Sequence, residues 1–202
     1  MGDMIHMNKQ AFFNKLFTNG ISYENYVNNS DKYKERMNSS FLAGKKAVEK
    51  LAHEQIVRLN EKIYVLCIAE TWCSDCANGV PVIALLAELF PNWNFRIVSR
   101  DQFKEEFNIF YSTAGRMKIP VIIFADEDGD EIMRWIERPI RSYQLLGSLR
   151  DQNLPKEEFI QKVHDTLEFQ PPIVSEAILN ELIFVAEKAA SIVHVNPPSR
   201  KN

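Results

Sequence analysis

The chain has 202 residues, of which 46% are hydrophobic and 25% charged, and its formal net charge is −3. This composition is ordinary for a globular chain with a real core, and so small a net charge argues against nucleic-acid and membrane-surface partners. No apolar stretch reaches membrane-spanning length, and residues 1–10 lack the charged-then-apolar order of a secretory signal, so we expect a cytoplasmic protein.

The first part of the chain, 1–61, is predicted to form a helical N-terminal extension. Aromatic and aliphatic residues cluster within 12–17 and again within 23–27. Further along, apolar residues recur at helical spacing between Lys and Glu residues: Val48, Leu51, Ala52, Ile56 and Leu59. This spacing predicts a long amphipathic helix whose apolar stripe would cover a sheet.

A central domain is predicted for residues 62–170, and it begins with a strand–helix–strand unit. Residues 63–69 form a continuous apolar run, as expected for a strand that is buried on both faces. Residues 80–89 predict a helix that ends near Pro91, and residues 94–98 predict a second strand. Two strands joined by a helix at this length are expected to be parallel, with a right-handed crossover.

The second half of the central domain is predicted to add a helix and a hairpin. Residues 101–110 indicate a helix with three phenylalanines on one side, and residues 121–124 indicate a third strand. The acidic segment 126–130 contains a glycine and is a strong turn signal, and 132–136 follows it as a fourth strand. A hairpin is therefore expected between the third and fourth strands.

Two helices are predicted for the rest of the chain. The first opens at Pro155 and runs through Phe169, and Pro171-Pro172 breaks it. The second covers 173–193 and belongs to a C-terminal helix and tail, 171–202. The extension, the central part and this last segment are expected to form a single domain.

The cysteines indicate redox chemistry rather than scaffolding. Of the three, Cys73 and Cys76 are separated by two residues and lie between the first predicted strand and the following helix. In a reducing compartment such a close pair is typical of a catalytic or a metal-binding site. A structural zinc site needs four ligands, but there is no second Cys-x-x-Cys pair and the four histidines are scattered. We therefore expect no metal, and no cofactor beyond a redox-active disulfide between Cys73 and Cys76.

The residues around this pair resemble the thioredoxin family over about 62–169. Trp72 directly precedes the first cysteine, Pro81 lies eight residues after it, and Ile119-Pro120 precedes the third predicted strand. The order of the predicted elements also matches that family. The resemblance implies an α/β thioredoxin-like fold, in which a central mixed sheet of about four strands is flanked by helices, with extra N-terminal and C-terminal helices.

The resemblance also implies a role for each of these residues. Cys73, at a helix N-terminus that stabilises a thiolate, would be the nucleophile, and the more shielded Cys76 would be the resolving thiol. A cis bond before Pro120 would place the backbone of Ile119 beside the sulfurs, where it can pair with an extended substrate segment. Trp72 would add an apolar platform for the substrate.

Two departures from thioredoxin are expected to modulate this site. Ser74 and Asp75 stand between the cysteines in place of Gly-Pro, and the Asp75 charge favours the helix end but opposes a nearby thiolate. Cys67 stands where thioredoxins keep a buried acid, so Glu70 or water is a candidate substitute in proton transfer. Cys67 is most simply a small buried hydrophobe, with a third redox thiol as the alternative.

The function that follows is that of a thiol–disulfide oxidoreductase. Its partners would be a protein or small-molecule disulfide and an external reductant, with no nucleic acid and no membrane. The alternative is a non-catalytic binding or redox-sensing module, because a minimal oxidoreductase does not need sixty additional residues. Those residues could cover the sheet edge, narrow the cleft, or form the face of a homodimer.

Overall fold

The computed structural model describes residues 8–51, 59 and 61–196, and a four-stranded mixed sheet lies at its centre. The strands have the spatial order β2-β1-β3-β4, with β1 and β2 parallel and the other neighbouring pairs antiparallel. Their bounds are β1 Ile63–Ala69, β2 Trp93–Ser99, β3 Val121–Ala125 and β4 Glu131–Ile136. The predicted α/β fold, the parallel first pair and the hairpin are confirmed.

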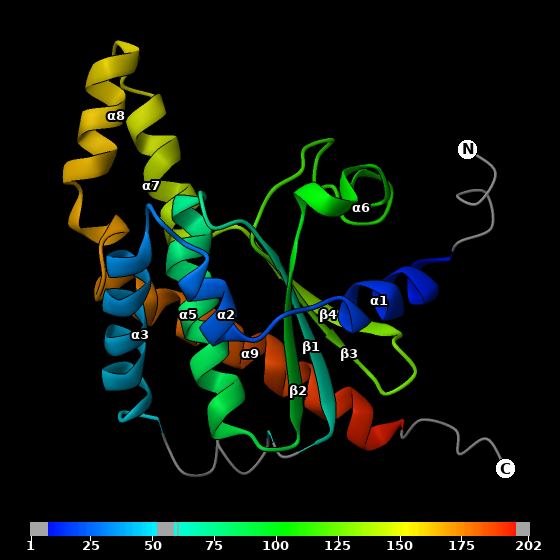
Figure 1. Ribbon diagram of the computed structural model, residues 1–202. Helices are drawn as coiled ribbons and strands as arrows, with labels where there is room; N and C mark the ends of the chain where they lie inside the picture. Colours follow the sequence, from blue (N-terminus) through cyan, green and yellow to red (C-terminus); the bar gives the residue numbers. More distant parts are fainter. Residues whose placement is uncertain (1–7, 52–58, 60, 197–202) are drawn as a thin grey trace, which may run out of the picture.

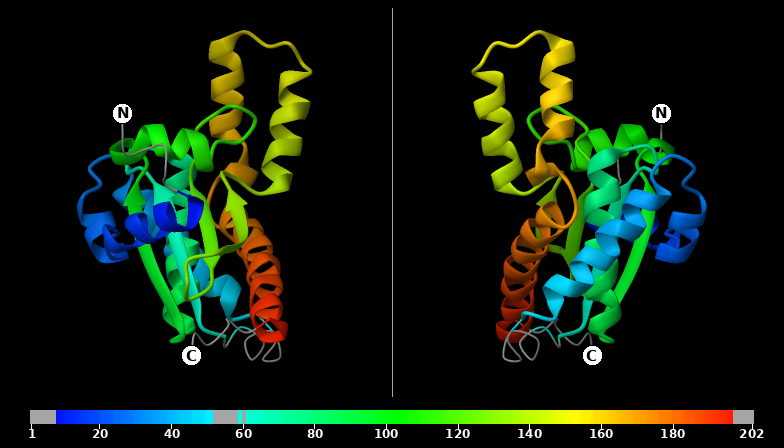
Figure 2. Two further views of the ribbon diagram at one scale, coloured as in Figure 1. Left: turned by 90° about the vertical axis from the view of Figure 1, so that its right-hand side faces the viewer. Right: turned by 90° about the vertical axis from the view of Figure 1, so that its left-hand side faces the viewer.

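Helices cover both faces of this sheet, which is why the apolar runs of β1 and β3 are almost fully buried (Figures 1 and 2). On one face lie α5 (Ser74–Leu89), which joins β1 to β2, and the long helix α9 (Ile173–Val195). On the other face lie α1 (Lys9–Thr18) and α6 (Lys104–Phe110), which a 3-10 turn over Asp101–Phe103 precedes. The redox pair lies in the connection from β1, one of the two inner strands, to α5.

The N-terminal helix α1 is part of the main core. Phe12 is fully buried, and its ring lies 5.4 Å from that of Phe110 and 5.9 Å from that of Tyr111. Phe17 places its ring 5.2 Å from Tyr64 of β1. Aromatic contacts of this kind dominate core energetics, so α1 is a structural layer of the fold rather than an appendage.

Two further helices, α2 (Tyr23–Asn28) and α3 (Lys34–Val48), complete the N-terminal region. Ile21 exchanges two backbone hydrogen bonds with Ile97, at 2.7 and 3.0 Å, and so covers the edge of β2. The buried face of α3 packs against α5 and α9 rather than on the sheet itself.

Of the amphipathic helix expected around 48–59, only residues 48–51 and 59 are described by the structure, and they are not part of one continuous helix. The helix α3 ends at Val48, and the backbone N–H groups of Lys50 and Leu51 bond to carbonyls three residues back, which tightens the chain into a turn. Leu59 is buried in a turn. Ala52 and Ile56, which belonged to the same prediction, lie outside the described residues.

The C-terminal region shows which helix covers the sheet. The helices α7 (Ile140–Arg150) and α8 (Lys156–Asp165) project from one end of the molecule (Figures 1 and 2). No element was predicted for 140–150, and the helix expected through Phe169 ends earlier, followed by a 3-10 turn over Leu167–Phe169. No residue of α8 is buried, whereas α9 presents a stripe of buried Ala and Leu residues to β3, β4 and α5. None of the helices in the described ranges is long and apolar enough to span a bilayer.

Candidate active site

The two cysteines lie at the N-terminus of α5, and their environments differ. Cys73 is the N-cap residue, and its Sγ accepts a hydrogen bond from the backbone N–H of Cys76 at 3.3 Å. Cys73 is largely buried but keeps a residue exposure of 9%, while Cys76 is fully buried one turn inside the helix. An incoming group can therefore reach Cys73 but not Cys76.

The same geometry separates the acidities of the two thiols. A hydrogen bond with the Cys76 side chain lowers the pKa of Cys73, and the backbone N–H groups of Cys76 and Asp75 lower it further, although burial and the Asp75 charge oppose the change. Burial raises the pKa of Cys76 well above its ordinary value, and its contact with Cys73 adds to that rise. Cys73 is thus the thiol that ionises first.

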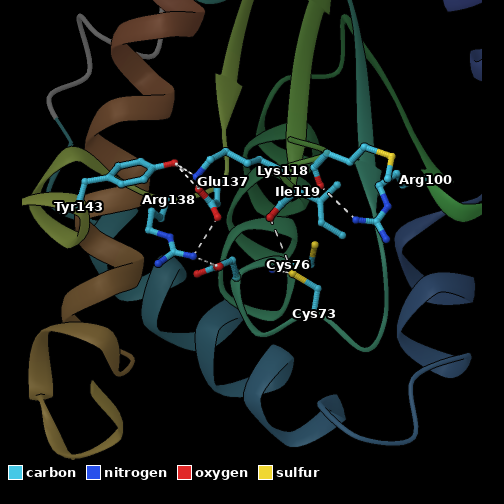
Figure 3. Close-up of polar contacts among 10 residues, drawn as sticks. Cys73, Cys76, Arg100, Lys118, Ile119, Glu137, Arg138 and Tyr143 are labelled. Carbon is cyan, nitrogen blue, oxygen red and sulfur yellow. Dashed lines mark hydrogen bonds and ion pairs between the residues drawn. The ribbon is translucent and has the colours of Figure 1, made fainter. Parts of the chain in front are cut away.

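The loop before β3 lies next to Cys73. The Ile119–Pro120 peptide bond is cis, as expected, and the Cys73 thiol donates to the carbonyl oxygen of Ile119 at 3.8 Å (Figure 3). Gly79 of α5 makes this approach possible, because a Cβ at that position would stand only 3.1 Å from Cγ of Pro120. Ile119 and Pro120 therefore lie directly beside Cys73 and the first turns of α5.

Trp72 directly precedes Cys73 and presents an exposed ring. Its side chain is half exposed, and the guanidinium of Arg100 lies 5.1 Å from the centre of its ring. Arg100 also donates to the carbonyl of Met117 at 3.1 Å, so it joins the Trp72 loop to the segment that leads into Pro120. Sequence reasoning did not single out Arg100, because it lies 28 positions from Trp72.

Cys67 and Glu70 lie close to the pair but differ in what they contact. Cys67 is fully buried in β1, and burial raises the pKa of its thiol. The Glu70 carboxylate accepts hydrogen bonds from the Ser99 hydroxyl at 2.6 Å and from the Asp101 backbone N–H at 2.7 Å. These bonds hold the carboxylate at the end of β2, and its role in proton transfer stays a prediction.

Asp75 belongs to an ion-pair network that joins four elements. Arg138, just after β4, places its Nη2 2.6 Å from Oδ2 of Asp75 and 3.0 Å from Oε1 of Glu137. The other Glu137 oxygen is bound by Lys118, which precedes the cis peptide, and by the hydroxyl of Tyr143 on α7 (Figure 3). These two hydrogen bonds lower the pKa of Glu137, although burial opposes them. We call the five residues Asp75, Lys118, Glu137, Arg138 and Tyr143 the Asp75 network.

Despite this pairing, the ionised form of Asp75 is disfavoured in the folded protein. Burial raises the pKa of Asp75 to about 6; the nearby Glu137 adds to the rise, and Arg138 opposes it. A carboxyl group whose pKa is raised by folding stabilises the fold at low pH, and that contribution is lost as the pH rises through the folded value. Asp75 is therefore a net cost to stability at neutral pH.

A substitution of Asp75 with asparagine should remove this cost. We expect Asp75→Asn to be more stable than the wild type at pH 7.5 by about 1–2 kcal/mol, with the gap closing between pH 6 and pH 4. The expected gain is kept small because a quarter of the side chain is exposed and therefore screened by solvent. Urea unfolding of the reduced proteins across this pH range is the measurement. A difference in the free energy of unfolding between the two proteins that does not change with pH would contradict this prediction.

The helices outside the central strands also shape the surface beside the redox pair. A cleft of about 470 Å³ lies between α3, the first turn of α5, residue 138 and α8. Arg36 of α3 lines this cleft and joins two of its walls: Nε donates to Oδ1 of Asn78 at 2.8 Å, and Nη2 donates to the carbonyl of Phe169 at 2.5 Å. Ser74 and Asp75 line the same cleft, so α3 and α8 adjoin the two residues between the cysteines.

Comparison with known proteins agrees with this geometry. A model of the family described as thioredoxin matches residues 20–153, about two thirds of the chain. The chain belongs to the thioredoxin family. The match begins just before α2 and ends after α7, so α2 and α3 lie inside the thioredoxin match while α1, α8 and α9 lie outside it.

Solved structures share the fold of this thioredoxin-family chain over nearly its whole length. One is a Pseudomonas aeruginosa protein of unknown function, 19% identical, with a TM-score of 0.60 over 87% of this chain and 97% of that one. Another is an HIV epitope-scaffold, 18% identical, with a TM-score of 0.60 over 86% of this chain and 96% of that one. No curated protein matches the chain in sequence.

Proposed function

We propose that this thioredoxin-family protein is a thiol–disulfide oxidoreductase that acts through Cys73 and Cys76. The observation that carries the proposal is the contrast at the start of α5, where an accessible thiol of lowered pKa lies one turn from a buried thiol of raised pKa. That contrast suits a nucleophile and a resolving thiol. The close cysteine pair also suits a reducing compartment, and the proposal places the protein in the cytoplasm.

The proposed reaction proceeds in two exchanges. The Cys73 thiolate attacks one sulfur of a substrate disulfide, which forms a mixed disulfide and releases the first substrate sulfur as a thiolate that takes up a proton. Cys76 then loses its proton, and its sulfur attacks Sγ of Cys73 and releases the second substrate thiol. The substrate disulfide is reduced to two thiols, and Cys73 and Cys76 are oxidised to a disulfide. An external thiol reductant returns two electrons and two protons.

The surroundings of Cys73 support an extended substrate segment. The backbone groups of Ile119 lie beside the sulfur, and Trp72 offers an exposed ring on the neighbouring loop. A segment laid between them would pair with the backbone of Ile119 in the manner of an added strand.

The experiment that tests the proposal is the reduction of insulin in the presence of dithiothreitol. We expect the wild type to accelerate precipitation of the insulin B chain and Cys73→Ser to show only the rate of dithiothreitol alone. Cys67→Ser is the matched control, because it removes a thiol that is buried in β1, and it should keep most of the activity. Equal rates for wild type and Cys73→Ser would favour the non-catalytic alternative.

A further inference from the structure

The residue between the cysteines raises a difficulty for the chemistry proposed above. Asp75 lies two positions after Cys73 in the first turn of α5, and its charge disfavours the Cys73 thiolate. A carboxylate at this position would offset part of the stabilisation that the backbone N–H groups of the helix N-terminus give to the Cys73 thiolate. The site therefore needs a positive group close to Asp75.

Arg138 meets that need from a distant part of the chain. Its Nη2 lies 2.6 Å from Oδ2 of Asp75, and about three quarters of each side chain is shielded from solvent. An ion pair so shielded from solvent is screened less than a surface pair. Among the described residues, Glu137 from the end of β4 and Arg36 from α3 also act on the Asp75 charge, and Lys118 from the loop before β3 pairs with Glu137.

The placement of Arg138 is itself fixed. Glu137 accepts from Arg138, Lys118 and the Tyr143 hydroxyl, and its backbone N–H donates to the carbonyl of Pro120 at 2.7 Å. The ring of Tyr143 also lies 5.6 Å from the Arg138 guanidinium. Within the Asp75 network the two carboxylates and the two cations balance, and loss of Arg138 would leave the network with one net negative charge, with Arg36 of α3 as a weaker cationic influence on Asp75.

We propose, as an extension of the oxidoreductase function, that Arg138 is a positioning residue which neutralises Asp75 and so keeps the Cys73 sulfur in its reactive, ionised form. Arg138 does not touch the reacting sulfurs and acts only through the carboxylate. The charged Asp75–Arg138 pair thus stands where thioredoxins have an uncharged dipeptide, and it makes the reactivity of Cys73 depend on a residue 63 positions after Asp75.

The test is the pH profile of Cys73 alkylation in the reduced full-length protein. Arg138→Met should move the inflection upward and spread it over two steps, because Asp75 and Cys73 then compete for one proton. The thiolate fraction at pH 7 should fall about three- to tenfold. Adding Asp75→Asn to Arg138→Met should restore a single inflection near the wild-type position, and Asp75→Asn alone should move it only by a few tenths of a pH unit.

Two further variants separate this role from a general effect of charge or folding. Arg141→Met removes the same charge from an exposed position on α7 and should leave the profile unchanged. Arg138→Lys keeps the charge and should keep most of the wild-type profile, even if Arg138→Met folds poorly. An unchanged profile in Arg138→Met, or a shift that Asp75→Asn does not reverse, would overturn the proposal. Because alkylation needs no disulfide substrate, it reports on this role even if insulin reduction fails.

Discussion

Replacing Cys76 with serine is expected to hold the substrate on Cys73 as a stable mixed disulfide. Cys73 keeps its place at the N-cap of α5 and the backbone N–H of residue 76, so the first exchange can still take place. The second exchange cannot, because no other thiol is accessible: Cys67 is fully buried in β1 and its pKa is raised. Turnover should therefore fall to the rate of the reductant alone, while covalent capture rises.

The measurement is capture of a disulfide-containing protein on immobilised Cys76→Ser, followed by elution with dithiothreitol. Cys73→Ser/Cys76→Ser is the control, since it keeps the fold and lacks both sulfurs of the pair. Bands that are released by dithiothreitol from the single variant and absent from the double variant are expected. Partners that both variants hold without a covalent bond would instead support a binding module.

A second large effect is expected from Phe12→Ala on stability. The ring of Phe12 is fully buried between α1 and α6, against Phe103, Phe110 and Tyr111. Truncation of a buried Phe leaves a cavity and costs about 3–5 kcal/mol. At a chain length near 200 residues this cost should lower the midpoint of thermal unfolding by about 6–20 °C.

The control for Phe12→Ala is Ile109→Ala, which removes an exposed apolar side chain from α6. Surface changes of this kind usually alter the free energy of unfolding by less than about 0.5 kcal/mol. Urea unfolding followed by circular dichroism compares the two. If Phe12→Ala is no less stable than Ile109→Ala, α1 is dispensable and its assignment to the core is wrong.

The features that the sequence could predict are those whose signal lies in neighbouring residues. The run 63–69, the cysteine pair after it and the acidic turn at 126–130 each carry their signal within ten positions. These signals predicted the first strand, the position of the thiols directly after it, and the hairpin between the third and fourth strands. Ile119-Pro120 was predictable only because its spacing from the cysteines resembles that of thioredoxin.

The features that sequence could not predict depend on the path of the chain. Arg138 and Asp75 are 63 positions apart, and no sequence pattern around either residue indicates that the two form an ion pair. The segment 140–150 contains Gly147 and no side chain that caps its N-terminus, so the local sequence gave no clear signal for the helix α7. The last helix, α9, is much richer in Ala, Ile, Leu and Val than α8, which indicates that it is the more buried of the two, but the strands that it covers follow only from the fold.

The role of the added helices also became clear only in three dimensions. The first sixty-one residues were expected to cover the sheet edge, narrow the cleft or form a dimer face. Ile21 covers the edge of β2, and Arg36 lines the cleft beside Ser74 and Asp75. The pairing of Ile21 with Ile97 agrees with the first of these expectations, whereas narrowing of the active-site cleft and the dimer remain predictions.

The central claim is that Cys73 and Cys76 form one redox couple, and a titration of the dithiol tests it most directly. The protein is equilibrated in glutathione or dithiothreitol buffers, its thiols are alkylated under denaturing conditions, and the products are counted by mass spectrometry. We expect Cys73 and Cys76 to be oxidised together in a single two-electron transition while Cys67 stays reduced. If both thiols of the pair remain free at every buffer ratio, or if Cys73 is oxidised without Cys76, the account is contradicted.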